Sequence, residues 1–217
     1  MTTVAGDRLT PEGVDFGMLT VAFDGHVLRP RPWTTMQSHW AADIARVVPP
    51  GPILELCCGA GHIGLLAAVI SGRRLVQVDS DPSACRLAQL NAERAGVHDQ
   101  VDVRCDDIAS ALRSSERFPL IIADPPYVPS AEVATFPDDP PSAIDGGQTG
   151  LDMIVRCLDV MRSDLLEDGV GLLQARGPSQ LATIGPLAHA RTLTVHAARV
   201  AGPDRAVGLL RRQRGRS

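Results

Sequence analysis

The sequence predicts an α/β fold with a mostly parallel, doubly wound sheet. Short apolar runs alternate along the chain with longer segments of helical periodicity, as expected of strands that are joined by helices. Acidic residues stand at or just after the ends of four of these runs, at Glu55, Asp79, Asp107 and Asp124. The carboxyl ends of parallel strands meet at one edge of the sheet, so these carboxylates should face a common ligand site.

Length and composition bound the protein class. The 217 residues suffice for one well-buried domain, and the net charge of −4 gives no overall attraction for nucleic acid. No apolar run reaches the length of a membrane span, and the N-terminus lacks a secretory signal, so we expect a cytoplasmic protein without a membrane partner. The five cysteines lack paired zinc spacing, and their odd number argues against a disulfide framework. We predict no metal site.

The N-terminal part should lead into the core. We expect residues 1–15 to be flexible and residues 16–50 to form a hairpin and a helix. Two apolar runs flank Asp24-Gly25, a dipeptide typical of hairpin turns. The following Arg29-Pro-Arg-Pro32 must be extended, because proline cannot join a regular helix or an inner strand. A helix is then expected to about Val48.

Residues 51–212 should form the main domain, followed by a flexible tail at residues 213–217. The predicted strands are residues 53–56, 75–78, 101–104, 120–123, 170–174, 192–199 and 206–211. The predicted helices are residues 61–70, 82–95, about 150–166 and about 178–189. Asp168-Gly169 should turn into the fifth of these strands, and the short turn at residues 202–204 predicts an antiparallel last pair.

A glycine-rich turn follows the first core strand. Gly59, Gly61 and Gly64 satisfy the pattern G-x-G-x-x-G at the start of a predicted helix. Residues without Cβ let the backbone approach a ligand, and the free N–H groups of the helix N-terminus point toward that ligand. Asp79 follows at about the spacing of a carboxylate that binds a ribose. The pattern predicts a nucleoside-binding half-fold for either a dinucleotide or S-adenosylmethionine.

Two further features favour S-adenosylmethionine. Glu55 ends its strand inside the predicted pocket, where its charge would repel a pyrophosphate and suit a cationic amino-acid tail. Asp124-Pro-Pro-Tyr127 ends a buried strand, and its two prolines restrict the backbone. A carboxylate, a carbonyl and an aromatic ring would then meet beside the cofactor. Methyl transfer to a planar nitrogen needs such acceptors for the N–H hydrogens and a stacking face for the flat group.

Several separate stretches resemble one family. Asp124-Pro-Pro-Tyr127 is similar to the Asn/Asp-Pro-Pro-Tyr motif of S-adenosylmethionine-dependent N-methyltransferases, and the wider sequence most resembles the HemK-type glutamine methyltransferases that modify peptide chain release factors. The resemblance is carried by Val27–Thr34, Glu55–Gly61, Val78–Pro82, Ala143–Asp152 and Ala201–Val207. It spans roughly residues 16–212. It implies a Rossmann-like class I methyltransferase fold with a seven-stranded sheet, an antiparallel C-terminal strand and an N-terminal hairpin.

The sequence departs from the family pattern at three points. We expect the family's separate N-terminal helical domain, which helps dock the release factor, to be lacking. Asp124 stands where the glutamine-specific members carry Asn, and Cys57 replaces the usual first glycine of the cofactor turn. The first two departures concern the substrate and leave the cofactor assignment intact.

The resemblance implies roles for single residues. The expected catalytic residues are Asp124 and Pro125, whose carboxylate and carbonyl would accept N–H bonds, and Tyr127, which would stack on the acceptor plane. The expected cofactor-binding residues are Glu55, Cys57, Gly59, Gly61, Asp79, Ser80, Asp106, Asp107 and Asp124. Only one of the adjacent Asp106 and Asp107 can point into the pocket, and the resemblance favours Asp107, near the adenine amino group.

Structural explanations compete at four positions. Asp81 is the better candidate for the cap of the helix after Asp79, which leaves Asp79 for the ligand. Cys57 is favoured as a small packing residue over a nucleophile, and His62 as a loop-packing residue over a general base. Residues 137–141, rich in proline and aspartate, should form a flexible loop over the site.

The methyl acceptor stays open between three classes. A protein glutamine comes first, a nucleic-acid base such as adenine or guanine of ribosomal RNA second, and a small metabolite third. The arginine-rich end at residues 211–216 favours nucleic acid, and the acidic net charge argues against it. A non-catalytic cofactor-binding scaffold and a dinucleotide oxidoreductase are weaker readings because neither needs the Asp-Pro-Pro-Tyr loop. Both a monomer and a homodimer are compatible with the sequence.

Overall fold

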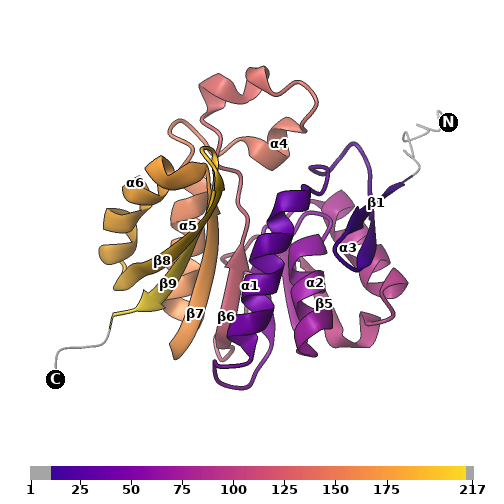
Figure 1. Cartoon of the computed structure of the whole chain (residues 1–217), viewed down its shortest axis with the longest axis horizontal. Helices are drawn as coiled ribbons and strands as arrows, with labels where there is room; N and C mark the ends of the chain where they lie inside the picture. Colours follow the sequence, from indigo (N-terminus) through magenta and orange to yellow (C-terminus); the bar gives the residue numbers. More distant parts are fainter. Residues whose placement is uncertain (1–10, 214–217) are drawn as a thin grey trace.

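The computed structural model describes residues 11–213 and contains a central seven-stranded sheet with helices on both faces (Figure 1). The strands are β3 (Ile53–Leu56), β4 (Leu75–Asp79), β5 (Val101–Cys105), β6 (Phe118–Ala123), β7 (Leu165–Ala175), β8 (Leu193–Gly202) and β9 (Arg205–Arg212). Their order across the sheet is β5-β4-β3-β6-β7-β9-β8. Neighbours from β5 to β7 pair in parallel, and β9 is antiparallel to both β7 and β8. The predicted fold class is confirmed.

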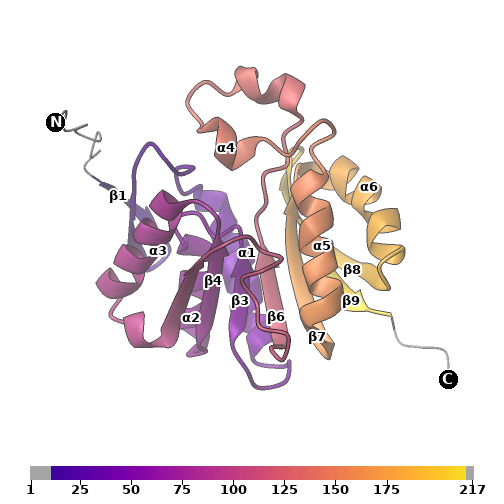
Figure 2. The same ribbon diagram turned by 180° about the vertical axis from the view of Figure 1, so that it is seen from behind.

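Helices cover the sheet in two groups. They are α1 (Thr35–Ala45), α2 (His62–Ser71), α3 (Pro82–Arg94), α4 (Pro141–Ile144), α5 (Asp152–Asp164) and α6 (Gly177–His189), with 3-10 turns η1 (Pro32–Thr34), η2 (His98–Gln100) and η3 (Ser130–Thr135). One apolar core joins the sheet to α1, α2 and α3, and a second joins it to α5 and α6 (Figures 1 and 2).

The inner strands belong to both cores, which explains their continuous apolar sequences. In β6 the side chains of Leu120 and Ile122 enter the first core, whereas Ile121 and Ala123 enter the second. All four are fully buried. A parallel strand that is covered on both faces needs apolar residues at every position, so the run ends where the buried surface ends, next to Asp124.

The N-terminal hairpin differs from the prediction. β1 (Glu12–Phe16) and β2 (Leu19–Phe23) pair antiparallel around Gly17 and Met18. Asp24 instead accepts a hydrogen bond from the His26 N–H (2.9 Å) in a local turn after β2. The predicted hairpin turn at Asp24-Gly25 is therefore wrong, and β1 overlaps the end of residues 1–15, which were predicted to be flexible. Gly17 takes φ +61°, and a Cβ at this position would collide with the Leu66 side chain. The turn of the hairpin therefore requires a glycine at the position that packs against the core.

A buried side chain of α3 hydrogen-bonds this hairpin to the main domain, in addition to the apolar packing of β1 and β2 in the first core. The Asn91 Oδ1 accepts a hydrogen bond from the Ala22 N–H (2.7 Å), and the Asn91 Nδ2 donates to the Ala22 carbonyl (2.9 Å). The same Nδ2 donates to the carbonyl of Ala60 in the glycine turn (2.9 Å). Asn91 thus connects β2, α3 and the glycine turn.

Other boundaries also moved. α5 ends at Asp164 and β7 begins at Leu165, so the predicted turn at Asp168-Gly169 lies inside a strand, at an irregularity of its pairing with β6. Residues 1–10 and 214–217, with half of the arginine-rich end, lie outside the described residues. No helix between residues 11 and 213 has the length and apolarity that a bilayer crossing needs. Within the same range, no cluster of His, Cys, Asp and Glu could hold a metal ion.

Candidate active site

A cavity of about 490 Å³ lies at the carboxyl ends of β3, β4 and β6. Its walls are the segment after β2, the glycine turn and the Asp-Pro-Pro-Tyr loop, and the segment with α4 lies above them (Figure 2). The predicted site residues that line it are Glu55, Cys57, Gly59, Asp79, Ser80, Asp107, Asp124, Pro125 and Tyr127. Gly61 and Asp106 are not part of its lining.

The glycines of the turn serve different purposes. A Cβ on Gly59 would meet nothing within 4 Å, so this residue leaves open space at the cavity. A Cβ on Gly61 would lie 2.5 Å from the Gln77 amide, and one on Gly64 would lie 2.4 Å from the Glu55 carboxylate. At Gly61, predicted to bind the cofactor, the missing Cβ lets α2 pack closely against side chains of β3 and β4.

The Glu55 carboxylate is buried and held by hydrogen bonds from neighbouring protein groups. Its side chain is only 2% exposed. Its carboxylate accepts hydrogen bonds from the Gly64 N–H (2.9 Å) and the Gln77 Nε2 (2.6 Å). Burial raises the pKa of Glu55 to about 7, against the lowering effect of these two hydrogen bonds.

Asp79 connects β4 to the glycine turn. One carboxylate oxygen accepts from the Gly59 N–H (2.8 Å) and the other from the Asp81 N–H (3.0 Å). Burial raises the pKa of Asp79 despite these hydrogen bonds. Asp81 caps α3 by accepting from the Ser83 N–H (2.7 Å), as predicted. Asp79 therefore lines the cavity and holds the glycine turn in place through the Gly59 N–H.

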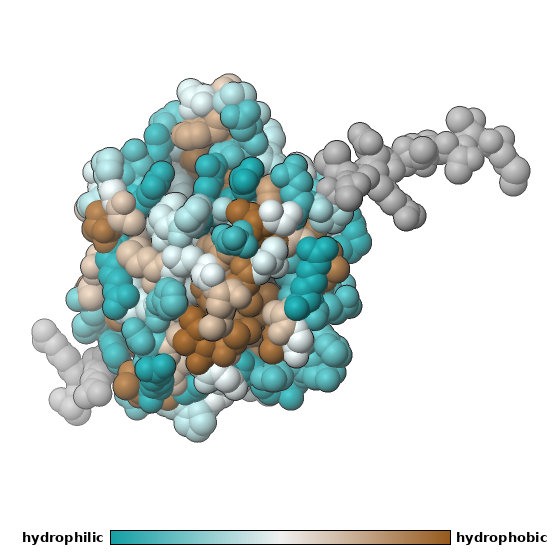
Figure 3. Space-filling model, turned by 45° about the vertical axis from the view of Figure 1, so that its right-hand side comes forward, coloured by the Kyte–Doolittle hydropathy of each residue, from teal (hydrophilic) through white to brown (hydrophobic). Residues whose placement is uncertain are grey.

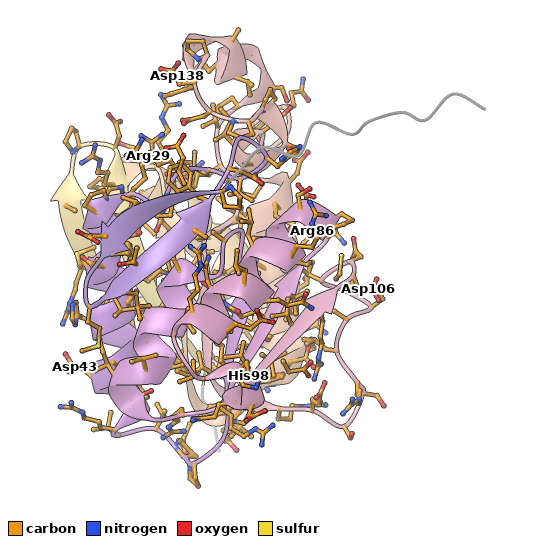
Figure 4. All side chains as sticks on the ribbon, turned by 90° about the vertical axis from the view of Figure 1, so that its right-hand side faces the viewer. Arg29, Asp43, Arg86, His98, Asp106 and Asp138 are labelled. Carbon is orange, nitrogen blue, oxygen red and sulfur yellow. The ribbon has the colours of Figure 1, made fainter. Side chains whose placement is uncertain are left out.

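Of the two adjacent aspartates after β5, Asp107 lines the cavity. Its carboxylate accepts hydrogen bonds from the guanidinium of Arg156 and the N–H of Ala109, and Arg156 lowers the pKa of Asp107. Asp106 accepts from the Ser110 hydroxyl (2.9 Å) and lies at the outer edge of the molecule (Figure 4). Asp106 thus braces its own loop and lies outside the cavity lining, whereas Asp107, which the resemblance favours, is part of it.

The Asp-Pro-Pro-Tyr loop contributes the carboxylate of Asp124 to the cavity wall. In the described part of the chain, no hydrogen bond reaches the Asp124 carboxylate, and its pKa rises to about 7 through burial and the nearby charge of Glu55. Pro125 beside it is buried. Burial raises the pKa of Tyr127 to about 12, and the Gln174 side chain near its hydroxyl opposes this rise. Asp124 is therefore free to bind a hydrogen-bond donor that enters the cavity.

The glycine-rich stretch at residues 146–150 braces this loop. The Gly146 N–H donates to the Val128 carbonyl (2.8 Å), and Gly150 takes φ +72° where a Cβ would lie 2.4 Å from the Tyr127 carbonyl oxygen. The Gln180 Nε2 donates to the carbonyls of Tyr127 (3.1 Å) and Gly150 (3.2 Å). Only glycine allows this close backbone approach, so the stretch supports the geometry of the loop.

Two ion pairs hold the covering segment over the cavity. Arg31 binds Asp139 through both carboxylate oxygens (2.6 and 2.7 Å), and Arg176 pairs with Glu132. The loop at residues 137–141 is therefore attached at the site. In Figure 4, Arg29, which lines the cavity, lies below the part that carries Asp138, and Figure 3 shows mainly hydrophilic residues at the top of the molecule.

Several residues in or around the cavity carried no assigned function in the sequence. His62 lines it, is neutral because burial lowers its pKa to about 4, and packs edge-on against Phe16. This matches the predicted packing role. Arg156, Gln174 and Gln180 were missed, because each is a single polar residue outside any recognisable motif.

Comparisons with known proteins agree with this geometry. A family model described as "Methyltransferase small domain" matches residues 43–136. The chain is 32% identical over 182 residues to a "Release factor glutamine methyltransferase" of Deinococcus radiodurans, covering 82% of this chain and 63% of that protein. It is 31% identical over 131 residues to a "Ribosomal protein uL3 glutamine methyltransferase" of Burkholderia pseudomallei, covering 55% of this chain and 43% of that protein.

Solved structures share the fold. A T. thermophilus 16S rRNA methyltransferase in complex with AdoMet and guanosine superposes with a TM-score of 0.69 at 19% identity, over 94% of this chain and 50% of that one. At this identity the likeness concerns the fold alone. The chain spans about half the length of the curated relatives it matches.

Proposed function

This chain belongs to the HemK-type family of S-adenosylmethionine-dependent methyltransferases, and from that premise we propose that it methylates a planar nitrogen, first of all a protein glutamine amide. The observation that carries the proposal is the Asp124 carboxylate, which lines the cavity without a hydrogen-bond partner among the described residues. The relatives named as glutamine methyltransferases support the same acceptor class. We place the reaction in the cytoplasm, and this location stays a prediction.

The cofactor is S-adenosyl-L-methionine, and the residues of the cavity fit it. Glu55, Asp79 and Asp124 all line the cavity, and burial raises the pKa of each. A cationic ligand would offset the cost of burying these negative charges and would reduce their mutual repulsion. A pyrophosphate would instead add further negative charge to the cavity. When bound, the cofactor supplies a methyl group on a positively charged sulfur.

We propose that seven residues of the lining hold this cofactor: Glu55, Cys57, Gly59, Asp79, Ser80, Asp107 and Asp124. Gly61 contributes indirectly by allowing the close packing of α2. Residues 51–212 would form the methyltransferase domain, with residues 16–50 leading into it.

The loop residues then act on the acceptor. An amide nitrogen is a poor nucleophile because its lone pair is delocalised, so catalysis depends on orientation and on acceptors for its N–H hydrogens. Asp124 and the Pro125 carbonyl would accept those hydrogen bonds, and Tyr127 would stack on the amide plane. The pKa of Asp124, about 7, suits a group that takes up the proton released from the nitrogen.

Labelling identifies the acceptor. The purified protein is incubated with methyl-labelled cofactor and a lysate of its own host lacking the enzyme, and protein, RNA and small molecules are then separated. We expect label in a protein, released as N-methylglutamine after enzymatic digestion. The Asp124→Ala variant serves as the control for background labelling. Label confined to RNA or to small molecules would reject the protein-glutamine proposal and leave the N-methyltransferase assignment standing.

A nucleic-acid base is the second candidate, and the rim of the cavity favours it. Arg29 lies over the Phe23 ring (5.1 Å) and Arg205 over the Trp33 ring (5.9 Å), and both arginines line the cavity. Arginine and aromatic side chains together suit phosphates and stacked bases. The RNA fraction of the labelling experiment tests this candidate directly.

A further inference from the structure

Four buried side-chain atoms lack a hydrogen-bond partner in the described part of the chain: Gln37 Oε1, His62 Nδ1, Gln77 Oε1 and Gln174 Oε1. His62 and Gln174 also line the cavity. His62 lies in the glycine turn and packs on Phe16, whereas Gln174 is near the hydroxyl of Tyr127 in the acceptor region. Gln174 is only 2% exposed. A buried oxygen without a hydrogen bond is destabilising, and where that oxygen also lines a cavity a ligand there can supply the missing hydrogen.

The sheet register brings Gln174 next to Asp124. Ala123 of β6 pairs with Leu173 of β7 in a parallel ladder, so Asp124 and Gln174 follow at the next position of neighbouring strands. Both residues line the cavity. Among the described residues, neither the Asp124 carboxylate nor the Gln174 Oε1 has a hydrogen-bond partner, so two neighbouring strand positions each present an unpaired oxygen acceptor to the cavity.

We propose that Gln174 is a specificity-determining residue whose Oε1 accepts a hydrogen bond from the N–H group of the substrate beside Asp124. The inference rests on the proposed function and explains how the site would select a neutral primary amide over a carboxylate. Such an amide carries two N–H hydrogens and can serve a charged and a neutral acceptor together. A carboxylate of the same shape has no hydrogen to donate, and its charge would meet those of Asp124 and Glu55.

The arrangement also explains why the second acceptor is neutral. A carboxylate at position 174 would add another charge to a cavity in which burial already raises the pKa values of Glu55 and Asp124 to about 7. An amide oxygen accepts the hydrogen bond without this repulsion. Gln174 therefore allows the site to hold an amide and a cationic cofactor without a further excess of negative charge.

Binding of a small probe tests the inference without turnover. The full chain, saturated with the demethylated cofactor, is titrated with Nα-acetyl-glutamine methylamide and separately with Nα-acetyl-glutamate methylamide, and binding is followed by ligand-observed NMR. We expect the wild type to prefer the amide. Gln174→Met keeps the side-chain length and removes the acceptor, and it should weaken amide binding roughly tenfold to a hundredfold. The affinity for the demethylated cofactor should be unchanged.

Gln37→Met is the matched control. Gln37 is also fully buried with an unpaired Oε1, but it does not line the cavity. This variant should melt at a lower temperature and bind the amide probe like the wild type. Equal amide affinity in the wild type and Gln174→Met would overturn the inference, as would equal or absent binding of the two probes to the wild type.

The inference and the proposed function fail separately. If the wild type labels a host protein and Gln174→Met does so with the same KM, the role of Gln174 is rejected and the function stands. If the wild type prefers the amide probe and labels no protein, the amide subsite stands and the protein-glutamine function is rejected.

Discussion

The two halves of the cavity differ in how their polar groups are satisfied. On the side of β3 and β4, Glu55 and Asp79 each accept two hydrogen bonds from groups of the protein itself. On the side of β6 and β7, Asp124 and Gln174 face the cavity with unpaired oxygens. The carboxylates of the cofactor half are therefore held in place by the protein itself, whereas Asp124 and Gln174 of the acceptor half still need hydrogen-bond donors. Specificity for the methyl acceptor should therefore reside in the second half.

The largest expected effect is on turnover, in the acceptor half. Asp124→Ala removes the proposed acceptor for the nitrogen's hydrogen and its proton, so kcat should fall by roughly a hundredfold or more. The variant should fold, because no hydrogen bond of the described residues depends on this carboxylate. Methyl transfer is measured with labelled cofactor and folding by circular dichroism. Near-normal turnover in a folded variant would remove Asp124 from the mechanism.

The next effect is on stability, in the cofactor half. The folded-state pKa of Glu55 is about 7, above the ordinary value of 4.5, so near neutral pH the folded protein holds a proton that the unfolded chain releases. Stability should be fully present below pH 4.5 and fall as the pH rises to 7, by an amount on the order of 3 kcal/mol from this group.

Urea unfolding of the ligand-free protein between pH 5 and pH 8 measures this loss. Glu55→Gln should reduce the slope of stability against pH, and Glu93→Gln, at an exposed position of α3, should leave it unchanged. An identical slope in the wild type and Glu55→Gln would show that protonation of Glu55 does not contribute to the pH dependence of stability.

A smaller effect tests the brace of the acceptor half. Gly150→Ala and Gly72→Ala place a Cβ at nearly equal φ angles, +72° and +70°. At Gly72 the space is open, so the cost should be about 1 kcal/mol of backbone strain. At Gly150 the Cβ would lie 2.4 Å from the Tyr127 carbonyl oxygen, so the loop must move, and we expect about 1–2 kcal/mol more, together with reduced kcat. Equal losses in both variants would mean that the loop is not braced here.

The smallest expected effect concerns cofactor affinity. The cofactor and its demethylated product should raise the melting temperature, and NAD should not. Asp79→Ala should lower the affinity for the cofactor roughly tenfold and so reduce the rise in melting temperature. The substitution removes both the proposed ribose ligand and the acceptor for the Gly59 N–H. Stabilisation by NAD alone would overturn the cofactor assignment.

The sequence predicted the sheet and the strand-end carboxylates because both are local signals. A strand buried on both faces is apolar throughout, and its end is marked by the first polar residue, as at Asp124. The hairpin turn was predicted wrongly because Asp24-Gly25 has the better local preference. The contacts that decide it, Leu66 against Gly17 and Asn91 on Ala22, come from residues far along the chain.

The same reasoning explains the missed site residues. Gln180 braces the loop by donating hydrogen bonds to the carbonyls of Tyr127 and Gly150, which lie 53 and 30 residues away in the sequence. Gln174 is one polar residue in the apolar run of β7, and only the register with β6 brings it to Asp124. Neither residue lies at a fixed sequence distance from its partners that a motif could describe. The contacts of both residues depend on how distant segments are arranged in the fold.

The three hydrogen bonds of Asn91 have a consequence for local opening of the native state. A two-stranded hairpin such as β1–β2 is only marginally stable alone, so its protection against solvent must be borrowed from the domain. Because Asn91 binds both Ala22 and the carbonyl of Ala60, separation of the hairpin exposes buried polar groups of the glycine turn in the same event. The amides of β2 and of the cofactor turn should therefore belong to one cooperative unit in native-state hydrogen exchange, and a ligand held by that turn should slow exchange in the hairpin as well.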